Sequence, residues 1–568
     1  MKKINYFALF TIAAIALSSC GGLNKMRDKA ADVSYSVTPA ILEEHGDKVA
    51  MKIDVKYPAK YFNKKAILTA TPVLKYEGGE TAFAPKVLQG EDVDANNQVV
   101  AFSSGGSASH SATLDFKEEM MKSKLVIRTM AELKGKSMTF DDYPVADGVI
   151  ATPKLVMIDP KPVIVSDKYQ RIVPDSYTAD ILYIINRYDL RKSELSKDEI
   201  NELREYIDKA QADERVELKN AQISGYASPD GPIDLNEKLS KNRQSTAEGF
   251  FTKELKSKKV ETPPGFLSTN YTAEDWDGFR KLMEKSNIQD KEIILRVLSM
   301  YSDPIVREKE IKNISQAYEQ IAEEILPLLR RSQFTVNTEV IGLSDDELRA
   351  AWNSKSSLKL EEILYTANLY DDLDEKLAIY KRAGDQYPQD FRAFNNQGYV
   401  HVLLGDADNA QKAFEKAKSL NDNDVVNNNL GVAALMKGDI AKAEQLFTAS
   451  TGAGAAVNYN LGTVKIIKGE YDAAANYLGN TNEYNTALVK LLKKDFDGAL
   501  STINKVEKDF AKKHYLKAVI AAKQNKDELV FESLKLAFSK DASLKNRAKV
   551  DMEFGKYFEN NTFTGLVR

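Results

Sequence analysis

Apolar and polar residues alternate along the early part of the chain with the period of two that is typical of β-strands. The clearest run is Val49–Val55, and further runs cover Ala66–Tyr76, Val99–Phe102, Ser111–Phe116, Lys124–Met130 and Ser137–Phe140. Breaks rich in Gly, Asn and Ser separate these runs. Several short strands at this spacing predict an N-terminal all-β sandwich over residues 34–160. It carries no chemical motif, and we expect it to be a spacer or docking module.

Strands and helices alternate after a linker with three prolines, Pro160–Pro174. The expected elements are a strand at Asp180–Tyr188, a helix at Lys197–Ala210, a strand at Val216–Ser224, a helix at 235–256, a long helix at Ile305–Leu329 and a final strand after Arg331. This order predicts a central α+β domain over residues 170–345. A helical insertion at about 258–304 interrupts it.

Small residues recur at regular steps from about Ser357 onwards. Those of the expected first helices are Gly398, Gly431, Gly462, Ala487 and Ala518. Twelve residues after each comes a second position, occupied by Ala410, Ala443, Ala474, Ala499 and Val530. Large residues follow four positions later, namely Phe414, Phe447, Leu478, Ile503 and Leu534. The pattern predicts stacked helix pairs, an all-α solenoid over 357–540, with a degenerate pair near Leu360–Pro388 and a cap or tail at 541–568.

The first residues have the features of a targeting segment. Lys2 and Lys3 precede the apolar run Tyr6–Leu17, which is too short to span a membrane. The run ends in Leu-Ser-Ser-Cys, which resembles the lipobox of bacterial lipoproteins. The resemblance implies a signal peptide at 1–19, acylation of Cys20 and a lipidated tether at 20–33. The alternative is an ordinary signal peptide followed by an unrelated cysteine.

Composition narrows the classes of function. A chain of 568 residues is long enough for several domains, and a net charge of −4 provides no basic footprint for nucleic acid. The one cysteine, Cys20, excludes a disulfide framework, and the four histidines lie far apart. No nucleophile–base pair, metal-ligand set or phosphate-binding loop is present. We therefore expect neither enzymatic activity nor a cofactor.

A strand–loop–helix stretch at 223–251 carries the most specific motif. Its positions Gly225, Gly231, Asn236, Leu239, Ser240 and Arg243 are spaced as in Gly-His-Thr-Asp-x-x-Gly-x4-Asn-x-x-Leu-Ser-x-x-Arg. This pattern belongs to the OmpA-like peptidoglycan-binding domain, which the stretch resembles. Tyr226 and Ala227 replace the family's His and Thr, and Ser228 replaces its Asp.

The resemblance implies a site for the diaminopimelate of the peptidoglycan stem peptide. In the family, the missing Asp and the Arg together hold that group. Here Arg243 would bind a carboxylate, with Asp230 as a possible acceptor for the ammonium. The candidate site is Ser228, Asp230, Asn236 and Arg243. The alternative is that Asp230 serves only the turn and that Arg243 pairs with a local acid.

The helical repeats resemble the tetratricopeptide repeat. That family binds peptides or protein partners on its concave face, and asparagines near the start of the first helix often hold a peptide backbone. Asparagines recur there as Asn395, Asn396, Asn427, Asn428, Asn458 and Asn460. The candidate partner-binding residues are Asn395, Asn427 and Asn458. The alternative is that these are helix-start residues, a place that Asn favours.

Together these features indicate a non-enzymatic lipoprotein, anchored in outer-membrane lipid through acylated Cys20 and facing the periplasm. It would contact peptidoglycan through the OmpA-like domain and scaffold an unidentified protein partner through the repeats. In the alternative, the chain is an accessory lipoprotein of an outer-membrane protein assembly, secretion or motility complex. Its OmpA-like domain would then no longer bind the wall.

Overall fold

The computed structural model describes residues 21–313 and 315–568. The chain forms two compact units, one from Met1–Ser166 with Asp372–Arg568 and the other from Asp167–Asp371. The expected signal peptide and Cys20 lie outside the described residues, so the lipid anchor stays a prediction. Within the described ranges, no helix has the length and apolar character that crossing a bilayer requires.

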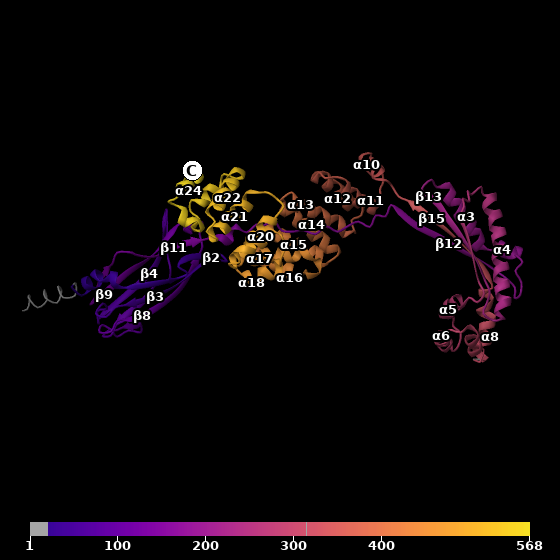
Figure 1. Ribbon diagram of the computed structural model, residues 1–568, viewed down its shortest axis with the longest axis horizontal. Helices are drawn as coiled ribbons and strands as arrows, with labels where there is room; N and C mark the ends of the chain where they lie inside the picture. Colours follow the sequence, from indigo (N-terminus) through magenta and orange to yellow (C-terminus); the bar gives the residue numbers. More distant parts are fainter. Residues whose placement is uncertain (1–20, 314) are drawn as a thin grey trace, which may run out of the picture. The chain divides into compact units, whose positions relative to one another are not determined.

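The β-rich region is one curled sheet rather than two separate layers. Within residues 21–166 its eleven strands are β1 (Ser34–Thr38), β2 (Ile41–His45), β3 (Lys48–Tyr57), β4 (Ala66–Tyr76), β5 (Gly79–Ala82), β6 (Lys86–Gly90), β7 (Gln98–Val100), β8 (Gly106–Asp115), β9 (Ser123–Leu133), β10 (Lys136–Thr139) and β11 (Tyr143–Ile150). β2 pairs with β3 and also with β11, which joins all strands into a half-barrel (Figure 1). The β-rich part of the prediction is confirmed, and the two-sheet sandwich is corrected.

Alternation along β3 explains this region's core. Every second residue of β3 is buried, and Val49 and Ile53 share a core with Leu125 and Ile127 of β9. Residues 21–28, expected as part of the lipidated tether at 20–33, are helical. Leu23 and Met26, three residues apart on one helical face, are buried in a second core of the same region. The segment that follows Cys20 is therefore packed against the half-barrel.

The central unit contains a four-stranded sheet with helices on it. Its elements are β12 (Ile172–Leu182), α2 (Lys192–Leu195), α3 (Asp198–Ala212), β13 (Val216–Tyr226), α4 (Ile233–Ser257), β14 (Leu267–Thr272) and β15 (Arg331–Ile341), in the sheet order β12-β15-β13-β14. Leu203 of α3 and Phe251 of α4 pack with Ile223 and Phe334 of the sheet. The unit is thus α+β, as expected.

A helical subdomain separates β14 from β15. Its helices are α5 (Trp276–Lys285), α6 (Lys291–Met300), α7 (Pro304–Lys312), α8 (Ser315–Glu324) and α9 (Leu326–Leu329). The insertion therefore lies later than the predicted 258–304, and the single helix expected at Ile305–Leu329 is divided into three. Phe279, Ile294 and Ile321 belong to a core of its own.

Helix pairs make up the C-terminal array. After α10 (Asp345–Asn353) and α11 (Leu360–Thr366) of the central unit come α12 (Leu373–Gln386), α13 (Phe391–Leu403), α14 (Ala407–Leu420), α15 (Asp424–Met436), α16 (Ile440–Thr448), α17 (Ala455–Ile467), α18 (Tyr471–Leu478), α19 (Tyr484–Leu492), α20 (Phe496–Lys505), α21 (Ala511–Lys523), α22 (Asp527–Lys540), α23 (Leu544–Ala548) and α24 (Asn561–Val567). The prediction of an all-helical repeat region is confirmed. The degenerate pair expected near Leu360–Pro388 is split, because α11 and α12 fall in different units.

The recurring small residues lie where paired helices touch. A Cβ atom added at Gly431 would lie 2.6 Å from the ring of Phe447, which is closer than real Cβ atoms approach. Gly398 stands in the same relation to Phe414, and Gly462 to Leu478. The small-against-large pairing inferred from the sequence is confirmed.

We expect Gly431→Ala to destabilise the array by about 1–3 kcal/mol, because the added methyl group overpacks the contact with Phe447. Hydrogen exchange in α15 and α16, followed by mass spectrometry, measures the effect. Gly249→Ala in α4 is the matched control, since nothing lies within 4 Å of its added Cβ. Replacing this helical glycine should stabilise its unit by about 0.5–1 kcal/mol. Unchanged exchange in α15 and α16 of Gly431→Ala would contradict the assigned contact.

Candidate functional site

Four asparagines occupy the same position in successive repeats. Each stands two residues before the small residue of its first helix, and the four are Asn396, Asn429, Asn460 and Asn485. Two helical residues turn through about 200°, so this position faces away from the second helix and into the concave face. All four side chains are nevertheless buried. A segment of the same chain covers them.

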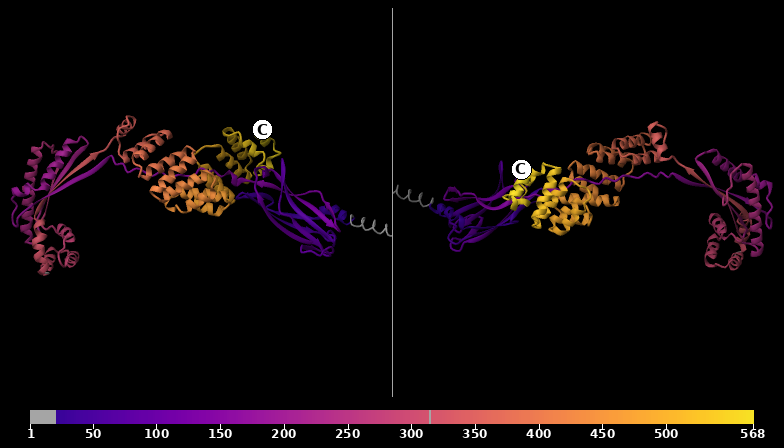
Figure 2. Two further views of the ribbon diagram at one scale, coloured as in Figure 1. Left: turned by 180° about the vertical axis from the view of Figure 1, so that it is seen from behind. Right: turned by 45° about the horizontal axis from the view of Figure 1, so that its top comes forward.

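The covering segment is residues 155–165, which we call the strap. It leaves the β-rich region and follows the first helices of the array (Figure 2). Four strap residues are each bound by a different asparagine. The asparagine side-chain amide accepts from the N–H and donates to the C=O of the same strap residue, an arrangement we call an amide clamp. Asn485 clamps Met157, Asn460 clamps Lys161, Asn429 clamps Val163 and Asn396 clamps Val165. The eight donor–acceptor distances lie between 2.7 and 3.0 Å.

The prolines of the strap fit the spacing of the clamps. Lys161, Val163 and Val165 present their N–H groups to the asparagines, whereas Pro160 and Pro162 occupy the positions before two of them. Proline lacks an N–H group, fixes its own φ and pushes the preceding residue towards extended conformations. The prolines therefore keep the strap extended without removing a donor that the groove uses.

A second row of side chains links the clamps of neighbouring repeats. The Nδ2 group of a clamp asparagine also donates to a side-chain oxygen in the preceding repeat. The residue that carries this oxygen stands three positions before the small residue of that repeat. The pairs are Asn429 with Asn395 at 2.9 Å, Asn460 with Asn428 at 3.1 Å and Asn485 with Tyr459 at 3.3 Å. Asn395 and Asn428 donate in turn to the strap carbonyls of Val163 and Lys161. Each repeat thus orients the amide of the next, and buried amides need such partners.

Tyr459 adds contacts to strap side chains. Its hydroxyl donates to the carboxylate of Asp159, and the Lys161 ammonium lies 4.6 Å from the centre of its ring. Burial and the nearby Asp159 raise the pKa of Tyr459, which keeps the hydroxyl protonated as a donor. The groove therefore contacts the acidic side chain of Asp159 and the basic side chain of Lys161, two residues apart, in addition to the backbone of the strap.

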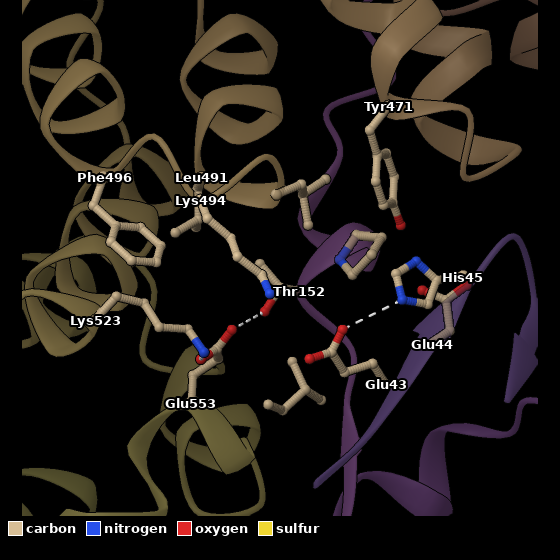
Figure 3. A pocket seen from close by; sticks show the side chains of 13 residues that line it. Glu43, Glu44, His45, Thr152, Tyr471, Leu491, Lys494, Phe496, Lys523 and Glu553 are labelled. Atoms are coloured by element: carbon tan, nitrogen blue, oxygen red, sulfur yellow. Dashed lines mark hydrogen bonds and ion pairs between the residues drawn. The ribbon is translucent and has the colours of Figure 1, made fainter. Parts of the chain in front are cut away.

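The strap starts beside a hollow of about 90 Å³ between β2 and the array (Figure 3). The Thr152 hydroxyl donates there to Glu553, whose carboxylate also pairs with Lys523 at 2.5 Å. Burial raises the pKa of Glu553, while Glu43 raises the pKa of His45 through a 3.3 Å hydrogen bond. Throughout 21–313 and 315–568, no cluster of three His, Cys, Asp or Glu side chains could hold a metal ion. The Thr152–Glu553 hydrogen bond and the Lys523–Glu553 ion pair join the start of the strap to the array at this point.

The asparagines proposed from the sequence differ in their surroundings. Asn395 contacts the strap, as described above. Asn427 bonds instead to Lys418 and Asp422, and Asn458 is exposed. Asn427 and Asn458 stand four residues, about one helical turn, before the small residue. They therefore lie on the same face of the helix as the small residue, which packs against the second helix, and not on the face that lines the groove. The signal that finds the clamps is a constant offset of two residues from the small position.

The loop after β13 is closed by its own hydrogen bonds. Asp230 accepts from Ser228 and pairs with Arg330 at 3.0 Å, and Arg330 also donates to Ser228 at 3.1 Å. Asn236 donates to the carbonyls of Ser228 and Gly231, both at 3.1 Å. Three predicted site residues therefore lie together and satisfy one another.

Arg243 points into the interior of the central unit. It is 1% exposed, and its guanidinium donates to the carbonyls of Arg187 at 3.0 Å and Tyr226 at 2.8 Å. The group also lies 5.2 Å from the centre of the Tyr183 ring. Burial lowers the pKa of Arg243 to about 10. With these two backbone carbonyls as partners in a buried place, the charge faces the interior of the unit.

A match to a family model supports the repeat fold. The tetratricopeptide repeat family matches at residues 391–424. Among solved structures, PilW, a widely conserved type IV pilus biogenesis factor, is 18% identical with a TM-score of 0.29, covering 38% of this chain and 100% of its own. YrrB, a tetratricopeptide repeat protein with an unusual peptide-binding site, is 21% identical with a TM-score of 0.24, covering 29% and 92%. A tetratricopeptide repeat protein from Parabacteroides merdae is 18% identical with a TM-score of 0.30, covering 37% and 91%. The comparison with curated proteins finds no match.

We expect Asn429→Ala to free the middle of the strap, because the substitution removes both bonds to Val163. Amide exchange over 159–166 should rise at least about tenfold, in line with a loss of about 1–3 kcal/mol for two buried hydrogen bonds. Asn427→Ala is the control on the same helix, and it should leave the strap unchanged. Equal exchange of the strap in both variants would contradict the clamp.

Proposed function

We propose that this protein is a non-enzymatic scaffold whose tetratricopeptide array holds an extended peptide by its backbone. The observation that carries the proposal is the set of amide clamps on Met157, Lys161, Val163 and Val165. In the folded chain the occupant is the strap, so the groove first serves to tie the half-barrel to the array. Each net hydrogen bond contributes about 0.5–1.5 kcal/mol, and eight of them make a firm tie.

The proposal places the protein on the periplasmic face of the outer membrane, anchored by acylated Cys20. The lipobox-like ending at Cys20 supports this location. The packing of Leu23 and Met26 adds that the half-barrel begins within a few residues of the anchor. An anchored half-barrel tied to the array would hold the array near the membrane, where membrane-protein partners are available.

For the central unit, the inward orientation of Arg243 favours the second of the two functions considered from the sequence. A guanidinium bound to two backbone carbonyls is not free to take a diaminopimelate carboxylate. We therefore propose an accessory lipoprotein of an outer-membrane assembly, secretion or motility complex, whose OmpA-like domain serves as a structural module. Direct peptidoglycan binding through Ser228, Asp230, Asn236 and Arg243 stays a prediction to be tested beside it.

We expect Cys20→Ala to abolish incorporation of labelled palmitate and to move the protein from the outer-membrane fraction to the soluble periplasm. Each buried CH₂ of an acyl chain contributes about 0.8 kcal/mol, so loss of the chains removes the anchor. Ser19→Ala, one residue earlier, should remain labelled and membrane-bound. Membrane retention of an unlabelled Cys20→Ala protein would contradict lipid anchoring.

We expect the wild-type protein not to co-sediment with purified sacculi and to crosslink in cells to one dominant membrane protein. Asp230→Ala is the informative variant for the sacculus arm, because Asp230 is only half-buried in its loop, whereas Arg243 is fully buried and supports the fold. Wild-type retention on sacculi that Asp230→Ala loses would overturn the accessory role and restore direct wall binding.

A further inference from the structure

We propose that the distal part of the groove, built on Asn396, Asn429 and Asn460, is an exchangeable peptide site gated by the strap. When strap residues 159–165 leave it, the site takes an extended segment of a partner protein with proline at alternate positions. This inference rests on the proposed function of the array and adds a partner chemistry and a gate.

The two halves of the strap are held in different ways. In the proximal half, Leu155 belongs to the array's main hydrophobic core, and the buried Tyr484 hydroxyl donates to its carbonyl at 3.0 Å. Thr152, just before it, is buried against Glu553. The proximal half cannot leave the groove without exposing core residues, so it stays bound.

The distal half is held through its backbone. Val163 and Val165 are half-buried, and Ile164 between them is exposed. Clamps grip the N–H and C=O groups of Lys161, Val163 and Val165, which any extended residue except proline could offer. This half can be exchanged for another segment while the same hydrogen bonds are formed again.

The contacts define the partner segment. Its residues at the clamped positions must carry an N–H group, which excludes proline there, whereas proline at the positions of Pro160 and Pro162 favours the extended form. Tyr459 adds a preference for an acid followed two residues later by a base, as in Asp159 and Lys161. The fitting ligand is a segment of the type Asp-Pro-Lys-Pro-Val-x-Val.

The covalent link makes the strap a strong competitor. A tethered segment acts at an effective concentration in the millimolar range. With an intrinsic dissociation constant of about 10 μM for the strap, a free peptide of the same affinity binds roughly 100-fold more weakly in its presence. Partners with ordinary peptide affinities therefore enter only when the strap is displaced. The strap sets the threshold for recruitment.

The test uses two neighbouring proline substitutions in the full-length chain. Val163→Pro removes the N–H that donates to Asn429 at 2.7 Å. Ile164→Pro places the same residue one position further, where no amide clamp uses the N–H. A fluorescent synthetic peptide with the sequence of residues 157–166 is the probe, and anisotropy measures its binding.

We expect Val163→Pro to bind the peptide at least about 30-fold more tightly than the wild type, and Ile164→Pro to bind like the wild type. Adding Asn429→Ala to Val163→Pro should abolish the gain, and a peptide with proline at the position of Val163 should not bind. Circular dichroism of each variant checks that the helices remain folded.

Two results would overturn the inference. One is a folded Val163→Pro protein whose distal strap exchanges freely but which does not bind the peptide. The other is equal peptide binding by the wild type and both proline variants, which would place the peptide outside the groove. Failure of the proposed function is distinguishable, because the wild-type amides of Lys161, Val163 and Val165 would then lack protection from exchange before any peptide is added.

Discussion

The amide clamp is the interaction on which the organisation of this chain depends. A primary amide holds a carbonyl acceptor and an NH₂ group with two donors in one fixed plane. The acceptor and one donor match the N–H and C=O of a single extended residue, and the second donor is left for the neighbouring repeat. Repetition of that amide by the solenoid creates a row of such matches, and the linking hydrogen bonds between rows fix the orientation of each. The array thereby recognises the path of a backbone, with few demands on the side chains.

The clamps also explain why the half-barrel and the array form one compact unit although they are separated by more than two hundred residues of sequence. The strap carries the half-barrel's last strand directly into the groove, and the Thr152–Glu553 contact seals the point of entry. The central unit is inserted between the end of the strap and α12. Its sheet, core and internally paired loop need no contribution from the clamps.

The sequence predicted those features that leave a periodic trace. Small residues opposite large ones recur at a repeat's spacing, so the pairing of Gly431 with Phe447 could be inferred from the sequence. The positions of the clamp asparagines can also be predicted from the sequence, because Asn429 and its equivalents all stand two residues before the small residue of their repeat. Nearness to the helix start points to Asn427 and Asn458 instead, but it carries no information about the direction in which a side chain points.

Other features left no such trace. The strap has the composition of a linker, and nothing in a single stretch of sequence shows that it lies against helices some 230 to 330 residues away. β14 was missed because its residues are mostly exposed at the edge of the sheet, so they show no apolar alternation. The direction of Arg243 depends on the carbonyls of the loop residue Arg187 and of Tyr226 at the end of β13, which the fold brings together, whereas a motif specifies only spacing.

The connectivity of the strap has a mechanical consequence. The chain passes into the central unit at Asp167, two residues after Val165, the last clamped residue. Tension on the chain at that point reaches the Val165–Asn396 clamp first, and the next clamp bears load only after this one opens. The clamps would thus open in order along the strap, from Val165 back towards Met157. An extended peptide held by a row of similar clamps can therefore respond to tension in steps.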